Sequence, residues 1–200
     1  MANFADDAAG LLSELDIAEI DVIGISFGGM VAQHLAIRHP KLIRKLVLAC
    51  TSPGGETYSS ADLLQLMDLP LEERQKAWLE MYDTRYQSGS TGKQFVYLLE
   101  KLITRNPSMF PNEASKGLMR QISARSSHDL SGDLRKISHR CLVVGGRYDG
   151  IAPPENLHYL SNNLQNCELR FFEGGHSFLW EDESAWKSIS AFLAKDDGTL

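Results

Sequence analysis

Four short runs rich in apolar residues divide the chain, at residues 22–25, 45–50, 140–144 and 168–172. The run at 45–50 is continuous, without alternation of apolar and polar positions, which is typical of parallel strands that are covered on both faces. A helical pattern of apolar positions separates the first two runs, so strand, helix and strand follow one another as in a right-handed crossover unit. The pattern predicts an α/β protein with a parallel sheet of about four strands.

The segments around these runs carry apolar residues at helical spacing. The chain opens on such a pattern, from Phe4 to Leu15, with no strand pattern before it. A second pattern follows the first run and ends at Pro40, because proline cannot extend a helix and disfavours the helical conformation of the preceding residue. Pro154 starts a third helix, and a closing helix carries Trp186 on its apolar face.

Residues 53–128 have a different character, because four helical stripes follow one another there without an intervening strand. Such a block between two buried parallel strands is most simply a helical lid over the carboxyl ends of the sheet, where α/β proteins bind ligands. We therefore expect a core of residues 1–52 and 129–200 and an inserted lid of residues 53–128. The Met and aromatic residues of the lid either line a substrate pocket or pack lid helices together, and the sequence leaves both interpretations open.

The motif Gly24-Ile-Ser26-Phe-Gly28 lies where the first predicted strand gives way to a helix. A G-x-S-x-G sequence in that context indicates a nucleophile elbow, in which a strained turn exposes the serine. We expect Gly24 and Gly28 to be required because a Cβ atom at either would collide with a neighbouring element. The Phe27 N–H and the positive end of the helix would then face an anion that forms on a substrate. The alternative is a glycine-rich turn that only packs tightly or binds a phosphate.

A serine nucleophile needs a base within hydrogen-bond reach and a third group that fixes the tautomer of the base. Asp149 and His176 follow the third and fourth predicted strands, so the chain order is Ser26, Asp149, His176. Each alone could be an ordinary loop residue, but together with the elbow they favour a catalytic triad. We expect structural or solvent-exposed roles for the remaining histidines, which are His34, His39, His128, His139 and His158.

From residue 24 to residue 193 the chain resembles α/β-hydrolase-fold proteins of the esterase, 3-oxoadipate enol-lactonase and non-haem haloperoxidase kind. The resemblance is carried by residues 22–29, 134–154 and 171–178, which contain the three motifs in register. It implies nucleophile Ser26, acid Asp149, base His176 and an oxyanion donor in the backbone N–H of Phe27. It also implies hydrolysis of carboxylic esters or lactones through an acyl-enzyme, without a cofactor or a metal.

The sequence departs from this family at its start, so the resemblance implies a truncated α/β-hydrolase-like parallel sheet with an inserted helical lid. Family members carry further strands before the opening helix, and a His-Gly loop that supplies a second oxyanion donor. Residues 1–21 match neither feature, so we expect half of the oxyanion hole to be missing, a loss that typically costs about 100- to 1000-fold in turnover. Two alternatives stay open, namely a non-catalytic α/β-hydrolase-like protein or gene remnant, and a cofactor-free haloperoxidase or perhydrolase.

The charge of the chain indicates which classes of partner are disfavoured, and the spacing of its cysteines indicates the state of the thiols. Lys and Arg number 20 against 26 Asp and Glu, and the net charge of −6 is spread along the chain, which disfavours nucleic acid and anionic membranes. The acidic start and the lack of a long apolar run favour a cytoplasmic protein. A small-molecule substrate is what the resemblance to the hydrolases implies. Cys50, Cys141 and Cys167 lie singly in apolar runs, so we expect free thiols.

The first predicted strand has an interior character, because its residues 22–25 include no charge and no proline. Without a preceding strand it becomes a sheet edge, and an unpaired apolar edge is a template for association. The sequence therefore predicts a homodimer or a larger assembly that buries the first strand or the adjoining face of the sheet.

Overall fold

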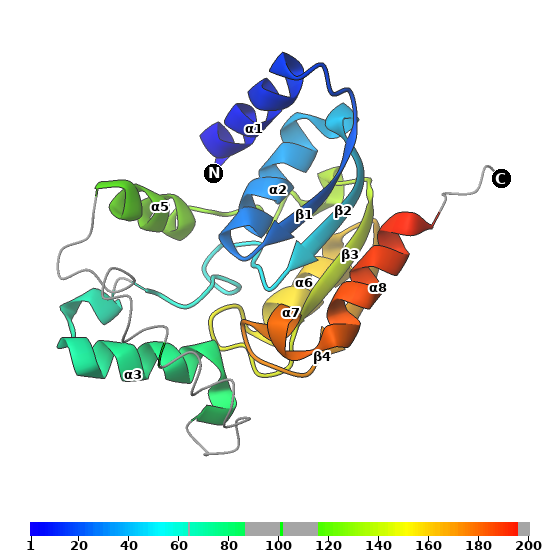
Figure 1. The fold of residues 1–200 in the computed structure, drawn as a ribbon. Helices are drawn as coiled ribbons and strands as arrows, with labels where there is room; N and C mark the ends of the chain where they lie inside the picture. The colour runs from blue at the N-terminus through cyan, green and yellow to red at the C-terminus, as the bar shows by residue number, and fades with distance from the viewer. Residues whose placement is uncertain (64, 87–100, 102–115, 196–200) are drawn as a thin grey trace.

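The computed structural model describes residues 1–63, 65–86, 101 and 116–195, and its centre is a parallel sheet (Figure 1). The strands lie in the order β1-β2-β3-β4. They are β1 (Ile20–Ile25), β2 (Ile43–Ala49), β3 (Arg140–Gly146) and β4 (Asn166–Phe172). The predicted fold class, a four-stranded parallel sheet in an α/β protein, is confirmed, and the strand boundaries differ from the predicted ones by a few residues.

Parallel pairing aligns the carboxyl ends of all four strands at one edge of the sheet. Leu48 lies beside Gly24 of β1 on one side and beside Val143 of β3 on the other, and Val144 pairs with Arg170 of β4. The loops that follow the strands therefore start close to one another. Ser26, Asp149 and His176 lie in these loops, and Phe27 is the first residue of the helix after β1.

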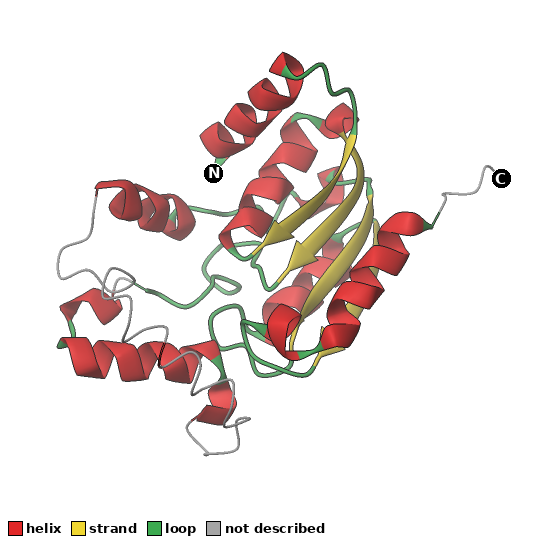
Figure 2. Ribbon diagram, in the orientation of Figure 1, coloured by secondary structure: helices red, strands yellow, loops and turns green. Residues whose placement is uncertain are grey.

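Helices cover both faces of the sheet (Figure 2). One face packs against α2 (Phe27–Arg38) and α6 (Pro154–Asn163), and the other packs against α7 (Phe178–Glu181) and α8 (Glu183–Ala194). The opening helix α1 (Ala2–Glu14) packs on α2, to which an ion pair between Asp6 and Arg38 also joins it. A short 3₁₀ helix, η1 (Pro40–Leu42), follows α2.

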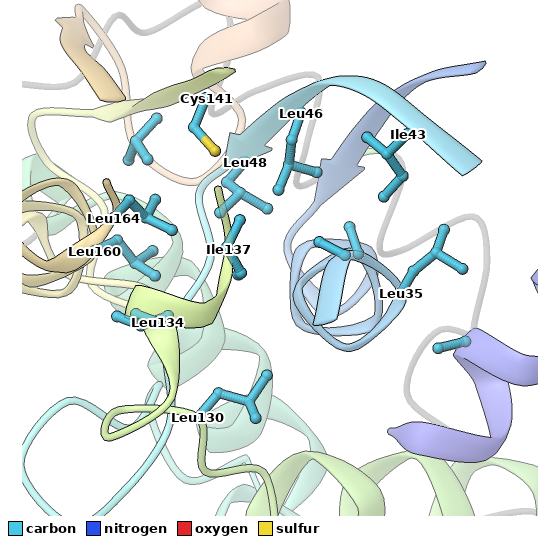
Figure 3. Packing of buried hydrophobic residues seen from close by; sticks show 14 of the residues in the cluster. Leu35, Ile43, Leu46, Leu48, Leu130, Leu134, Ile137, Cys141, Leu160 and Leu164 are labelled. Carbon is cyan, nitrogen blue, oxygen red and sulfur yellow. The ribbon is translucent and has the colours of Figure 1, made fainter. Parts of the chain in front are cut away.

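The central strands are apolar without alternation because both of their faces are buried. On β2, Leu46 and Leu48 join the core under α2 and α6, part of which is shown in Figure 3, whereas Val47 and Ala49 join the core under α8. Among the buried residues of β2, Lys45 is the polar one, and its Nζ donates to carbonyl oxygens at the end of α8, including Leu193 O at 3.1 Å. A cation there also complements the negative end of the helix dipole.

The described part of the predicted lid contains helices and no strand. They are η2 (Gln65–Asp68), α3 (Leu71–Tyr82), η3 (Thr84–Tyr86) and α5 (Lys116–Ser126), and η5 (Leu134–Lys136) leads back into β3. The helical stripe predicted around residues 95–102 lies almost entirely outside the described residues. The division into a core and a lid at residues 53 and 128 stays a prediction.

The three cysteines are free thiols, with Cys50 and Cys141 buried and Cys167 partly buried. Burial raises the pKa of the Cys167 thiol to about 12. Among the described residues, no helix has both the length and the apolar character needed to cross a membrane.

The outer edge of β1 pairs with no strand among the described residues, and this edge underlies our prediction of self-association. Ile23 is 37% exposed, and it lies on the α8 face because Ile25, its neighbour on that side of the strand, packs into the α8 core. We expect the protein to form dimers or larger assemblies in light scattering behind size exclusion, and Ile23→Lys to shift them toward monomers, since charged residues block edge pairing.

The matched control for this prediction is Leu11→Lys, which changes an exposed leucine of α1 and should leave the assembly intact. A wild-type protein that stays monomeric at every concentration would contradict the prediction.

Candidate active site

Ser26 connects the end of β1 to the start of α2 in a strained conformation. Its φ is 53° and its ψ is −118°, a region that residues other than glycine rarely adopt. Hydrogen bonds hold it there, because Ser26 N donates to Ala49 O at 2.8 Å and Ser26 O accepts from Thr51 Oγ1 at 2.8 Å. The loop after β2 thus supports the turn that presents the Ser26 hydroxyl.

The close packing around this turn involves a different pair of glycines from the pair that the motif suggested. A Cβ on Gly24 would lie 2.7 Å from Gly28 O, as expected, but a Cβ on Gly28 would meet nothing within 4 Å. The predicted collision at Gly28 is therefore wrong, because this position of α2 faces open space. Gly29 is the crowded one, since its Cβ would lie 2.6 Å from the Cβ of Thr51.

The loops after β3 and β4 bring Asp149 and His176 to Ser26. His176 Nε2 lies 2.9 Å from Ser26 Oγ, and His176 Nδ1 lies 2.8 Å from Asp149 Oδ2. Because a carboxylate only accepts hydrogen bonds, Nδ1 carries the proton in this arrangement and Nε2 can accept from the Ser26 hydroxyl. The three residues that the sequence singled out thus form one continuous hydrogen-bonded chain.

Backbone amides fix the Asp149 carboxylate from its other side. Asp149 Oδ1 accepts from Ile151 N and Ala152 N, each at 2.8 Å, and the side chain is 1% exposed. A buried carboxylate needs such partners, because an unpaired charge in the protein interior is costly. They leave Oδ2 directed at His176.

The Phe27 N–H, predicted as an oxyanion donor, is the first backbone amide of α2. The first amides of an α-helix have no acceptor within the helix, and the helix dipole is positive there. The neighbouring Gly29 N and Met30 N both bond to Ser26 O. The position of Phe27 N–H therefore suits an anion on an atom bonded to Ser26 Oγ, and its role as a donor stays a prediction.

Tyr82, in the last turn of α3, supports the base, and the sequence analysis missed this role. Tyr82 O accepts from His176 N at 2.7 Å, and the hydroxyl of Tyr82 accepts from Ser177 Oγ at 2.5 Å. Burial raises the pKa of Tyr82 above its ordinary value. Its hydroxyl within an apolar helical stripe was the one signal in the sequence, and it did not reveal the partner.

Cys50 lies beside the triad and raises the question of a metal. Donor atoms of Cys50, Asp149 and His176 all lie within 4.8 Å of one another. A thiol ligates metals as a thiolate, but burial raises the pKa of Cys50 far above its usual range, and the other two residues already bond to each other. This geometry favours the triad over a metal site, and the lack of a metal stays an expectation.

The other histidines lie apart from this hydrogen-bonded chain. His34 Nε2 approaches His128 Nδ1 at 3.3 Å, and His128 Nε2 donates to Ser52 O at 3.1 Å. His39 pairs with Asp6, and His139 bonds to Pro40 O. His158 is exposed on α6.

A cavity of about 200 Å³ lies beside the elbow, between the loop after β2 and α5. Its walls include Met30, one turn after Ser26 on α2, and the side chains of Ser52, Ser126 and Arg125. Ser26 itself is not among the lining residues, so this cavity adjoins the triad without containing it.

Comparison with known proteins places the fold in a family. A family model described as the alpha/beta hydrolase fold matches residues 1–183. A 2-hydroxymuconate semialdehyde hydrolase from Pseudomonas putida is 29% identical over an alignment that covers 98% of this chain and 70% of that protein. A poly(3-hydroxyalkanoate) depolymerase from Ectopseudomonas oleovorans is also 29% identical, over 86% of this chain and 59% of that protein.

Solved structures agree with this family. The enol-lactonase from Burkholderia xenovorans LB400 superposes with a TM-score of 0.75 at 18% identity, covering 96% of this chain and 72% of that one. At this identity the likeness concerns the fold alone. From the match over residues 1–183, the chain belongs to the alpha/beta hydrolase fold family.

Proposed function

We propose that this protein is a serine hydrolase that cleaves carboxylic esters or lactones through an acyl-enzyme. The observation that carries the proposal is the hydrogen-bonded chain from Ser26 Oγ through His176 to Asp149, at 2.9 and 2.8 Å. Relatives that are named as hydrolases support the class of reaction. The acyl group and the leaving group are left open.

The proposed reaction begins with attack of Ser26 Oγ on the acyl carbon. His176 Nε2 takes the hydroxyl proton, and Asp149 holds the ring and stabilises the imidazolium that forms. The Phe27 N–H and the positive end of α2 stabilise the negative charge on the former carbonyl oxygen. The bond to the leaving oxygen then breaks, and His176 returns its proton to that oxygen.

Water completes the cycle on the acyl-enzyme. His176 removes a proton from the water, the hydroxide attacks the acyl carbon, and the proton passes to Ser26 Oγ as the acid leaves. If the predicted loss of a second oxyanion donor is correct, both steps are slower by about 100- to 1000-fold than with a complete hole. Haloperoxidase or perhydrolase chemistry and a non-catalytic role stay as alternatives, and no specific contact among the described residues favours either.

Labelling with a fluorophosphonate tests the proposal without knowledge of the substrate. An activated serine displaces fluoride and forms a bond to phosphorus, which intact-protein mass spectrometry detects as a single added mass. We expect wild-type protein to be labelled once, Ser26→Ala not at all, and His176→Ala far more slowly, because Oγ then lacks its base.

The matched control is Ser13→Ala, which removes an exposed hydroxyl of α1 and should label like wild type. Wild-type protein that takes up no probe, or Ser26→Ala protein that is labelled equally well, would show that the nucleophile assignment is wrong.

A further inference from the structure

The end of α3 packs directly against the loops that carry the candidate acid and base. Gly150 N donates to Met81 O at 2.9 Å, and a Cβ on Gly150 would lie 2.8 Å from that oxygen. A Cβ on Gly175 would lie only 2.1 Å from Tyr82 O. Two glycines thus let main-chain carbonyls of α3 reach the residues beside Asp149 and His176, with no side chain between them.

A cluster of charged residues just after α3 stabilises the contact between this helix and the two loops. The Arg85 guanidinium lies 2.6 Å from Asp83 Oδ2 and 3.3 Å from Glu181 Oε2, and it stacks 4.1 Å from the ring centre of Tyr148. The Asp83 side chain is 5% exposed and that of Glu181 is 12% exposed. Because these carboxylates are largely shielded from water, their attraction to Arg85 is screened less than the attraction within an exposed surface pair.

Glu181 also bonds to the loop that carries the candidate base, His176. Its Oε1 accepts from Gly175 N at 3.1 Å, one residue before His176. Thr84 N donates to Tyr148 O at 2.9 Å, one residue before Asp149. The segment around Arg85 therefore contacts both loops immediately before their candidate catalytic residues.

We propose that Arg85 is a positioning residue, which clamps the end of α3 onto the acid and base loops. With the clamp in place, Tyr82 O holds the main chain of His176 so that Nε2 stays at 2.9 Å from Ser26 Oγ. This inference rests on the proposed hydrolase function and extends it, because it makes part of the helical insertion necessary for alignment of the triad.

Arg85→Met tests the clamp, because methionine fills similar space without the charge or the forked donors. We expect kcat for p-nitrophenyl acetate to fall by about 10- to 100-fold with little change in KM, since a displacement of catalytic groups by about 1 Å can cost 100-fold. The rate of fluorophosphonate labelling should fall in parallel. Arg85→Lys keeps the charge and should recover part of the loss.

Arg147→Met is the matched control. Arg147 pairs with Glu173 at 3.4 Å, so it also joins the two loops, but it is 55% exposed, and its loss leaves the contact of Arg85 with the same carboxylate, at 3.7 Å, in place. It should retain wild-type kcat. If Arg85→Met does not fold, Glu181→Gln decides, because it removes a charge that pairs with Arg85 while the amide oxygen can still accept from Gly175 N, and it should lower kcat several-fold.

The outcomes separate this inference from the function on which it rests. If the fluorophosphonate does not label wild-type protein, both the clamp and the proposed hydrolase function are wrong. Wild-type protein labelled at Ser26, together with a folded Arg85→Met variant that keeps wild-type kcat, or with such a Glu181→Gln variant where Arg85→Met does not fold, overturns the clamp alone. A fall in melting temperature without a change in kcat would likewise show that Arg85 only stabilises the fold.

Discussion

Replacement of Asp149 by asparagine is expected to lower the rate of ester hydrolysis by about 10,000-fold. Asp149 Oδ2 lies 2.8 Å from His176 Nδ1. An amide nitrogen at that place donates where the carboxylate accepted, so the ring adopts the other tautomer and Nε2–H then faces Ser26 Oγ. In that state the base cannot take the hydroxyl proton. Turnover of p-nitrophenyl acetate by the purified variant measures the loss.

The same substitution should cost little stability, which separates a catalytic role from a structural one. The amide oxygen of asparagine can still accept from Ile151 N and Ala152 N, the two bonds that Asp149 Oδ1 makes. Asp133→Asn, at a half-exposed aspartate before η5, is the control and should stay fully active.

An Asp149→Asn variant as active as wild type would require a different acid. The buried, protonated thiol of Cys50, just after β2, could not replace a carboxylate.

The sheet and the triad could be predicted from sequence because both follow from local patterns. Strands buried on both faces need continuous apolar residues, which is why β2 and β3 stand out. Residues that end parallel strands must meet at one edge, so the position of Ser26, Asp149 and His176 after successive strands implied their proximity. The distances among them depended on the fold and could not be derived from the pattern.

The predictions failed or fell short where a contact joins distant segments. Tyr82 and Ser177 are 95 positions apart, and no periodicity relates them. The role of Gly29 likewise depends on the approach of Thr51 from the loop after β2, whereas the motif itself drew attention to Gly28. Arg85 looked like an ordinary charged residue, because its partner Glu181 comes from a helix near the end of the chain.

The contact between the buried His128 and the partly buried His34 should make the free energy of unfolding depend on pH. Burial lowers the pKa of His128 to about 4, which outweighs the opposite influence of its hydrogen bond to Ser52 O. Burial also lowers the pKa of His34, whose Nε2 lies 3.3 Å from His128 Nδ1. The folded protein thus holds His128 neutral at pH values where the unfolded chain, with an ordinary histidine pKa near 6.5, binds a proton.

The unfolded state therefore takes up more protons than the folded state between pH 6.5 and pH 4, so acidification through this window favours unfolding. The His128 contribution is a loss of about 3 kcal/mol in the free energy of unfolding between pH 7 and pH 4, with little further loss below pH 4. Urea denaturation of wild type and His128→Gln across this range measures it. Glutamine can still donate to Ser52 O but does not titrate, so the free energy of unfolding of wild type should fall by about that amount relative to the variant as pH falls.

His158→Gln, on the exposed face of α6, is the control. Curves for wild type and His128→Gln that stay parallel from pH 7 to pH 4 would contradict the prediction.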